Sequence, residues 1–213
     1  LAKDSRRSSQ LGKGFIPFLT VIGIIAVLLF LQPATSMVVM LIAAGLAMYF
    51  VSGAKLRYIA TLGVCVAVAL AVVVAITPYR LQRIENFLNP ENDPARGGFH
   101  LNQAQIAIGS GKIFGVGFGN STTKLGYLPE PVGDSIFAII AEELGFVGVT
   151  VLLSVFLVLT LRIFLLARRT PDAFGELLLV GFGSLIAIQT IVNIAAISGL
   201  LPLTGTPLPF ISY

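Results

Sequence analysis

Long stretches without a charged residue dominate this chain and predict its helices. The first stretch, Gly14–Ala54, is 41 residues long. A helix needs about 20 apolar residues to cross a bilayer core of ~30 Å, so this stretch is too long for one span and fits two. Pro33 has no backbone N–H and disfavours helix at the residue before it, which places the break at residues 32–36. The pattern therefore predicts helices at about 15–32 and 36–52.

Three further uncharged stretches each predict one more spanning helix. The first is rich in Val and Ala, and Pro78 helps to end it, which gives a helix at about 58–78. The other two give helices at about 144–161 and 177–199. Repeated prolines after the last of these helices indicate a stretch that is not helical. The expected fold is all-α, a polytopic transmembrane helix bundle forming one membrane domain over residues 1–213.

The composition agrees with this interpretation and excludes other classes of protein. Hydrophobic residues make up 56% of the chain and charged residues 11%, whereas an average soluble domain is roughly a quarter charged. Too little polar surface is left to cover a soluble globule. The same numbers exclude a disordered chain, a collagen and a disulfide-rich scaffold. The sequence is that of an integral membrane protein.

The basic residues predict which side of the membrane each connection faces. Neither the turn at 32–36 nor the stretch after Gly199 contains one. Nine of the 14 lie in three connections: Lys3, Arg6, Arg7, Lys13, Lys55, Arg57, Arg162, Arg168 and Arg169. By the positive-inside rule these connections are cytoplasmic, so the long segment 79–133 lies outside the cytoplasmic membrane. The net charge of +4 comes from positions typical of membrane topology, and no nucleic-acid partner is expected.

The segment 79–133 is expected to be a long extracytoplasmic loop. Loops of this length usually carry a function or are disordered, and the aromatic residues here argue against disorder. An amphipathic stretch at 101–108 is suited to lie along the membrane surface. Alternating glycines within residues 115–119 favour tight turning, with a backbone nest for a lipid-borne phosphate as the alternative. The lone His100 is not expected to bind a metal.

The end of this loop contains the most informative acidic residues. Asp134 precedes an apolar run, so it is suited to cap a helix. Glu142 and Glu143 follow eight and nine positions later, about 12 Å along a helix axis. Acidic residues at the edge of a span are costly and are therefore candidate functional residues. Two interpretations stay open at each site. Asp134 is either a helix cap or a functional acid, and the two glutamates are either an interfacial anchor or a functional pair.

These residues belong to motifs that resemble the SEDS family of FtsW, RodA and SpoVE polytopic proteins, with the FtsW branch the most similar. The matching stretches run in order along nearly the whole chain: Gly53-Ala-Lys-Leu, Pro78-Tyr-Arg-Leu, Asn89-Pro-Glu-Asn-Asp-Pro, Gln103 with Ala107-Ile-Gly-Ser-Gly-Lys, Gly117-Phe-Gly-Asn-Ser, Lys124 with Tyr127-Leu-Pro-Glu, Asp134 with Ile136-Phe-Ala, Glu142-Glu-Leu-Gly-Phe, Gln189 with Asn193, Gly199-Leu-Leu-Pro, and Thr204-Gly with Leu208-Pro-Phe-Ile-Ser-Tyr. Their number and order make the resemblance specific.

Two stretches depart from the pattern of that family. The family usually has Gln-Pro-Asp-Leu-Gly where this chain has Gln32-Pro33-Ala34-Thr35-Ser36, so an acidic group is missing here. It also usually has His-Thr-Asp-Phe where this chain has Val132-Gly133-Asp134-Ser135. The Asp is kept and its neighbours are replaced.

The resemblance implies an activity and a location. Proteins of this family have ten spans, and this chain resembles spans five to nine. They are peptidoglycan glycosyltransferases, which polymerise lipid II at the outer face of the bacterial cytoplasmic membrane during cell division or growth. The chain begins at Leu1 rather than Met and ends in an uncharged run. We therefore expect a fragment of a longer polytopic protein that is inactive alone.

The resemblance also implies roles for the polar residues. Asp134 is expected to be the general base for the acceptor hydroxyl or to position that base. Lys124, Arg80 and Arg83 are candidates to stabilise the pyrophosphate leaving group, and a divalent cation, Mg or Mn, is a candidate cofactor. Further candidate substrate-binding residues are Glu130, Glu142, Glu143, Gln189 and Asn193.

The expected partners follow from the same resemblance. Family proteins work with a class B penicillin-binding transpeptidase, whose single span is expected to pack on the helices at about 144–161 and 177–199. Other membrane proteins of division or elongation, and membrane lipids, are expected neighbours. Two alternatives stay open. A lipid II transporter is favoured by the polytopic architecture and by polar Gln189 and Asn193 inside a span. A non-catalytic scaffold of the division machinery is favoured if the fragment is the whole protein.

Overall fold

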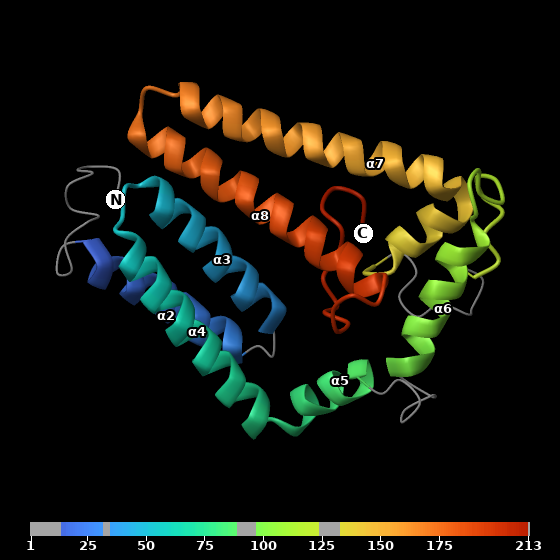
Figure 1. The fold of residues 1–213 in the computed structure, drawn as a ribbon, viewed down its shortest axis with the longest axis horizontal. Coiled ribbons are helices and arrows are strands. Elements are labelled where there is room, and N and C mark those ends of the chain that lie inside the picture. Colours follow the sequence, from blue (N-terminus) through green and yellow to red (C-terminus); the bar gives the residue numbers. More distant parts are fainter. Residues whose placement is uncertain (1–13, 32–34, 89–96, 124–132, 213) are drawn as a thin grey trace. The chain divides into compact units, whose positions relative to one another are not determined.

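A computed structural model describes residues 14–31, 35–88, 97–123 and 133–212, and Figure 1 shows its helices in chain order. They are α2 (Ile16–Leu31), α3 (Thr35–Val51), α4 (Leu56–Ile76), α5 (Pro78–Leu88), α6 (Gly97–Ser110), α7 (Ile136–Arg169) and α8 (Ala173–Ile197). The described ranges contain no strand, which confirms the all-α prediction. Helices α4, α7 and α8 are long and apolar enough to cross a membrane, and α2 and α3 are apolar but shorter.

The helix boundaries differ from the expected ones at Pro78 and around Gly145. Pro78 is the first residue of α5 and does not end α4, which already stops at Ile76. A proline is tolerated in the first turn of a helix, because the N–H that it lacks has no partner there. Helix α7 extends beyond the expected 144–161 at both ends: a short helix precedes Gly145, where the backbone is not helical, and a longer one continues after it to Arg169.

The segment 79–133, expected to be a loop, contains most of α5 and all of α6. Both helices carry polar residues throughout, so a search for uncharged stretches of spanning length does not find them. The amphipathic stretch 101–108 lies within α6. The side of the membrane that this segment faces stays a prediction.

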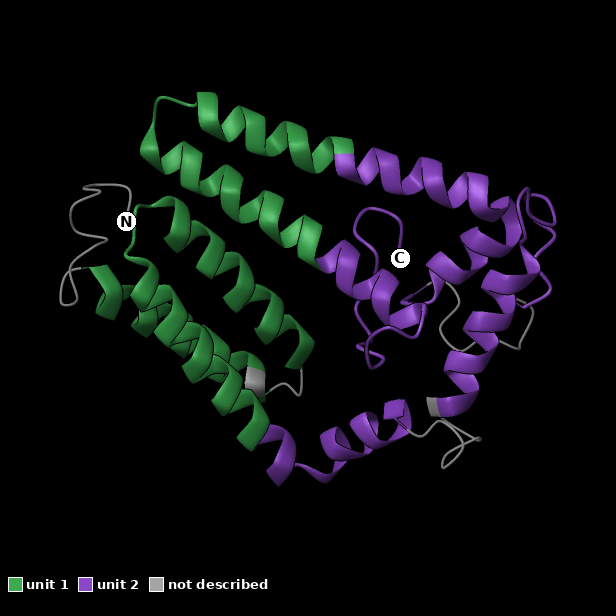
Figure 2. Cartoon of the chain, in the orientation of Figure 1, with its two compact units in different colours: residues 1–72, 158–188 green, residues 73–157, 189–213 purple. Residues whose placement is uncertain are grey.

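The chain forms two compact units, which Figure 2 distinguishes by colour. Unit 1 comprises residues 1–72 and 158–188, and unit 2 comprises residues 73–157 and 189–213. In unit 1, small residues allow close packing of apolar helices. Gly45 of α3 lies against Ile22 of α2, and Gly181 of α8 lies against Met48 of α3. Such close contacts between small and large residues are typical of helices that associate in lipid.

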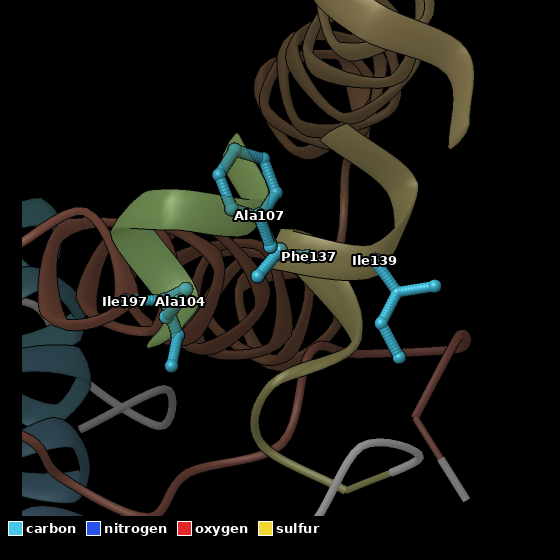
Figure 3. Packing of buried hydrophobic residues seen from close by; sticks show 6 residues of the cluster. Ala104, Ala107, Phe137, Ile139 and Ile197 are labelled. Carbon is cyan, nitrogen blue, oxygen red and sulfur yellow. The ribbon is translucent and has the colours of Figure 1, made fainter. Parts of the chain in front are cut away.

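Unit 2 is built around a small apolar cluster. Ala104 and Ala107 of α6 pack with Phe137, Ala138 and Ile139 at the start of α7 and with Ile197 at the end of α8. Figure 3 shows this packing from close by. Both alanines are fully buried, and their short side chains let α6 lie close to α7. The cluster therefore fixes α6 next to residues 133–136, which contain Asp134.

Candidate functional site

Asp134 lines a pocket of about 350 Å³ that lies entirely within unit 2. Helix α5 and helix α6 form much of its wall, and the segment after α8 completes it. The lining residues are Tyr79, Gln82, Arg83, Asn86, Phe87, His100, Leu101, Asp134, Leu203 and Gly205. A carboxylate, a guanidinium and an imidazole therefore open onto one space that also has an apolar wall.

The backbone at Asp134 is held in place from two directions. Asn193 of α8 donates hydrogen bonds from Nδ2 to the carbonyl oxygens of Asp134, at 2.9 Å, and Thr206, at 2.6 Å. Ser212 donates from Oγ to the carbonyl of Gly133, at 2.7 Å. Asn193 is only 1% exposed, so these bonds form away from water, where the alternative is an unsatisfied carbonyl. These hydrogen bonds hold the main chain at Asp134 and thereby fix the position from which its side chain extends.

The Asp134 side chain does not cap α7. Among the described residues, its carboxylate accepts a hydrogen bond from Ser135 Oγ, with 3.3 Å between Oγ and Oδ1, and not from a backbone N–H of the first turn. Ser135 Oγ also lies 2.6 Å from Nε2 of His100 on α6. The other carboxylate oxygen, Oδ2, lies on the side of Gly205, where a Cβ would be 3.9 Å away. Of the two interpretations left open for Asp134, the described residues therefore do not show the cap, and the residue lines the pocket instead.

Of the two arginines predicted to bind substrate, both of which lie on α5, Arg83 lines the pocket and Arg80 does not. Arg83 donates from Nη2 to the hydroxyl of Tyr79 at 2.7 Å, and its guanidinium lies over the Tyr79 ring at 4.8 Å from the centroid. The two residues are four positions apart on one helix, a spacing that places side chains together. Arg80 donates instead to Thr77 Oγ1 at 3.1 Å.

Glu142 and Glu143 do not line the pocket at Asp134; both contact the segment 121–123. Glu142 is 3% exposed and accepts hydrogen bonds from Ser121 Oγ at 2.5 Å, from Thr122 N at 3.2 Å and Oγ1 at 3.3 Å, and from Thr123 Oγ1. Glu143 accepts one from Ser121 N at 3.4 Å. The glutamates therefore anchor a loop to α7. The donors that bind them are hydroxyls and backbone N–H groups.

An earlier part of the same loop, residues 112–117, bonds to the backbone of α7 at Gly145, where the helix is broken. This glycine has φ 64 and ψ −164, values that interrupt the helix. Backbone groups freed by the break bond to the loop: Val116 and Gly117 donate to the carbonyls of Glu142 and Glu143, and Phe146 and Val147 donate to those of Lys112 and Ile113. Irregular backbone in an apolar helix is tolerated where neighbouring segments satisfy its polar groups in this way.

The alternating glycines have positive φ: 78 at Gly115, 102 at Gly117 and 83 at Gly119. This agrees with the tight turning predicted from the sequence, because L side chains rarely adopt such values. Gly115 also passes so close to α7 that a Cβ would meet the Glu143 carbonyl. These glycines let the loop approach the broken helix.

The remaining predicted residues fall into two groups. Gln189 donates from Nε2 to the Pro207 carbonyl at 2.9 Å, so like Asn193 it holds the proline-rich segment after α8. Lys124 and Glu130 lie outside the described residues. His100 and Ser135 were not predicted as site residues, and the only sequence signal for His100 was that it is the single histidine. Its partner is 35 positions away, a distance that local patterns do not bridge.

The described residues at the pocket include no cluster of metal ligands. Within the described ranges no three His, Cys, Asp or Glu side chains gather where they could hold a metal ion. Asp134 and His100 alone offer fewer protein ligands than structural and catalytic sites usually use. The divalent cation stays a prediction.

Comparison with known proteins relates the whole chain to one family. The family model FTSW_RODA_SPOVE, described as cell cycle protein, matches residues 1–213. The chain is 38% identical over 213 residues to stage V sporulation protein E of Bacillus subtilis (strain 168), covering 100% of this chain and 58% of that protein. It is 42% identical over 204 residues to the probable peptidoglycan glycosyltransferase FtsW of Nitrosomonas europaea, covering 94% of this chain and 53% of that protein.

A solved structure has a similar fold. One chain of a peptidoglycan synthase complex superimposes with a TM-score of 0.71 at 29% identity, covering 95% of this chain and 56% of that chain. The present chain therefore spans little more than half the length of the proteins that it matches.

Proposed function

The chain belongs to the FtsW, RodA and SpoVE family of cell cycle proteins, and from this premise we propose that the full-length protein is a peptidoglycan glycosyltransferase that polymerises lipid II. Relatives over most of this chain carry the name probable peptidoglycan glycosyltransferase FtsW. The observation that carries the proposal is the pocket of unit 2, in which Asp134 and Arg83 line the same space. A general base for the acceptor hydroxyl and a cation for the departing pyrophosphate are the two groups that this proposal assigns to the pocket.

The reaction forms one bond and breaks another. The 4-hydroxyl oxygen of the acceptor sugar bonds to the anomeric carbon of the donor, while the bond from that carbon to the pyrophosphate oxygen breaks. Asp134 accepts the hydroxyl proton, and its Oδ2 has acceptor capacity for this step. Arg83 donates N–H groups to the departing pyrophosphate and stabilises its charge.

The other polar residues support this pair in different ways. Asn193 and Gln189 hold backbone around Asp134 and the segment after α8, so we assign them a positioning role rather than contact with substrate. Glu142 and Glu143 anchor the loop at Gly145. Arg80, Lys124 and Glu130 stay candidates for binding the lipid-linked substrate.

The protein is a multi-pass membrane protein, and we propose that the segment 79–133 faces the outside of the cytoplasmic membrane. The absence of basic residues from the turn at 32–36 and from the stretch after Gly199 supports this orientation. The test is labelling of single cysteines with an impermeant thiol reagent in spheroplasts, in a Cys65→Ala background of the full-length protein. A cysteine at Asn120 is expected to react and one at Asp172 not to react. The opposite pattern contradicts the orientation.

The partner in this proposal is a class B penicillin-binding transpeptidase. Its support is the similarity to a chain of a solved peptidoglycan synthase complex. Exposed apolar side chains on α7, such as Val155, and on α8, such as Phe182, each suit a transmembrane helix as a neighbour. Membrane lipids suit the same surface.

The function test is polymerisation of purified lipid II by the full-length protein with its transpeptidase, with glycan chains separated on gels. Wild type is expected to form chains, and Asp134→Asn is expected to form few. Translocation of labelled lipid II in proteoliposomes tests the transporter alternative, which Gln189 and Asn193 favoured at first. Transport without polymerisation supports that alternative. The absence of both activities supports the non-catalytic scaffold.

A further inference from the structure

His100 is joined to the proposed general base by two consecutive hydrogen bonds. Its Nε2 lies 2.6 Å from Ser135 Oγ, and Ser135 Oγ lies 3.3 Å from Asp134 Oδ1. His100 is half-buried and lines the pocket, whereas Ser135 is 0% exposed. The serine hydroxyl is thus shielded from water between an imidazole and a carboxylate.

The direction of these hydrogen bonds follows from the chemistry of the three groups. An ionised carboxylate only accepts hydrogen bonds, so the single hydroxyl hydrogen of Ser135 is donated to Asp134. With that hydrogen directed to Asp134, Ser135 Oγ accepts from His100 when the imidazole carries a hydrogen on Nε2. This arrangement requires the tautomer of His100 that carries a hydrogen on Nε2, since a ring without that hydrogen has nothing to donate to Ser135.

Both ends of this chain of hydrogen bonds are fixed by packing. Helix α6 is held against the start of α7 by buried Ala104 and Ala107, which share a cluster with Phe137. The backbone of Asp134 is held by Asn193. The backbones that carry His100 and Asp134 are thus held in place on either side of Ser135.

We propose that His100 is a positioning residue for Asp134 and acts through Ser135. By donating to Ser135 Oγ it directs the hydroxyl hydrogen to Asp134 Oδ1, which leaves Oδ2, on the side of Gly205, to accept the proton of the acceptor sugar. This inference rests on the function proposed above, and it adds a residue that sequence analysis set aside as a lone histidine.

The test compares three replacements of His100 in the full-length protein with its transpeptidase and lipid II. His100→Ala removes the donor. His100→Gln places an amide N–H near the position of Nε2, whereas His100→Asn places it near Nδ1, too far back to reach Ser135. Loss of a hydrogen bond in a network that serves a charged group changes a rate about ten- to a hundredfold. We expect a fall of that size in kcat for the Ala and Asn variants, an unchanged KM for lipid II, and near-normal kcat for Gln.

A double-mutant cycle separates action through Ser135 from a simple packing effect. Ser135→Ala is expected to lower kcat by a similar factor, and adding His100→Ala to it is expected to lower kcat no further. Asn102→Ala, at an exposed position of the same helix, is the control and is expected to match wild type. Thermal unfolding and co-purification with the partner verify that each variant folds.

The outcomes distinguish this inference from the function on which it rests. If wild type forms no glycan chains, the proposed function fails and this inference fails with it. If wild type is active and His100→Ala matches it, the inference alone fails. Equal losses in the Gln, Asn and Ala variants, or a further loss in the double variant, also contradict it, because they show that the imidazole acts by shape or independently of Ser135.

Discussion

Two acidic sites lie eight positions apart near the start of α7, and their surroundings differ. Glu142 accepts hydrogen bonds from Ser121, Thr122 and Thr123, which fill the acceptor positions of its carboxylate. Asp134 accepts one from Ser135 among the described residues and opens onto a pocket. A carboxylate saturated by the protein holds structure together, whereas one with unused acceptor capacity beside a cavity is available to a substrate. Among the described residues, the number of donors around each carboxylate distinguishes the surroundings of Glu142 from those of Asp134.

The largest expected effect is on catalysis, at Asp134. Asp134→Asn keeps the shape of the side chain and its acceptor for Ser135, but an amide is not a base at neutral pH. General-base assistance is typically worth about 10²–10⁴-fold in rate, so glycan-chain formation is expected to fall by that factor with little change in thermal unfolding. Asp172→Asn is the matched control, because Asp172 accepts from Gly175 N at 2.9 Å and caps α8, a role that asparagine keeps. A normal rate in the Asp134 variant contradicts the comparison.

The next effect is on stability, at the break that Glu142 and its loop repair. A Cβ at Gly145 would meet the backbone of Ile113 and Gly115, in addition to the strain of its positive φ. Gly145→Ala is expected to destabilise the fold by roughly 2–4 kcal/mol, read as a lower unfolding temperature in detergent. Gly119→Ala separates the two causes. Gly119 has φ 83 and nothing within 4 Å of a Cβ, so it should show the smaller cost of strain alone.

The sequence predicts the apolar helices better than the site, for a physical reason. Spanning helices follow from uncharged length, which is a local property, and all five predicted segments are largely helical here. Helix α5 was not predicted, because its arginines and Glu85 interrupt any apolar run. The contact of His100 with Ser135 depends on how α6 packs against α7, and no short pattern encodes that. Ser135, identified in the sequence only as a departure from the family pattern, is the residue that donates to Asp134.

Glu142 tests the structural half of the comparison. In Glu142→Gln one acceptor oxygen becomes an NH₂ group that faces hydroxyl and N–H donors, so part of the buried network is left unsatisfied. We expect a loss of about 1–3 kcal/mol in stability, with glycan formation per folded molecule kept. Glu85→Gln, an exposed position on α5, is the control and is expected to change neither quantity. A loss of rate without a loss of stability places Glu142 in the chemistry instead.

The smallest expected effect concerns Arg83, the cation that lines the same pocket as Asp134. Arg83→Lys keeps the charge but loses the planar guanidinium that lies over Tyr79 and donates to its hydroxyl. A lysine also cannot make the paired N–H contacts with phosphate oxygens that an arginine makes. We therefore expect the apparent KM for lipid II to rise, by up to about tenfold, more than kcat falls.

Unit 1 supplies a matched control, since Arg57 lies over the Tyr58 ring at 4.9 Å and donates to its hydroxyl at 3.1 Å without lining the pocket. Arg57→Lys should leave both constants unchanged. If the two replacements change the apparent KM equally, the effect does not depend on lining the pocket, and the binding of the pyrophosphate by Arg83 is contradicted.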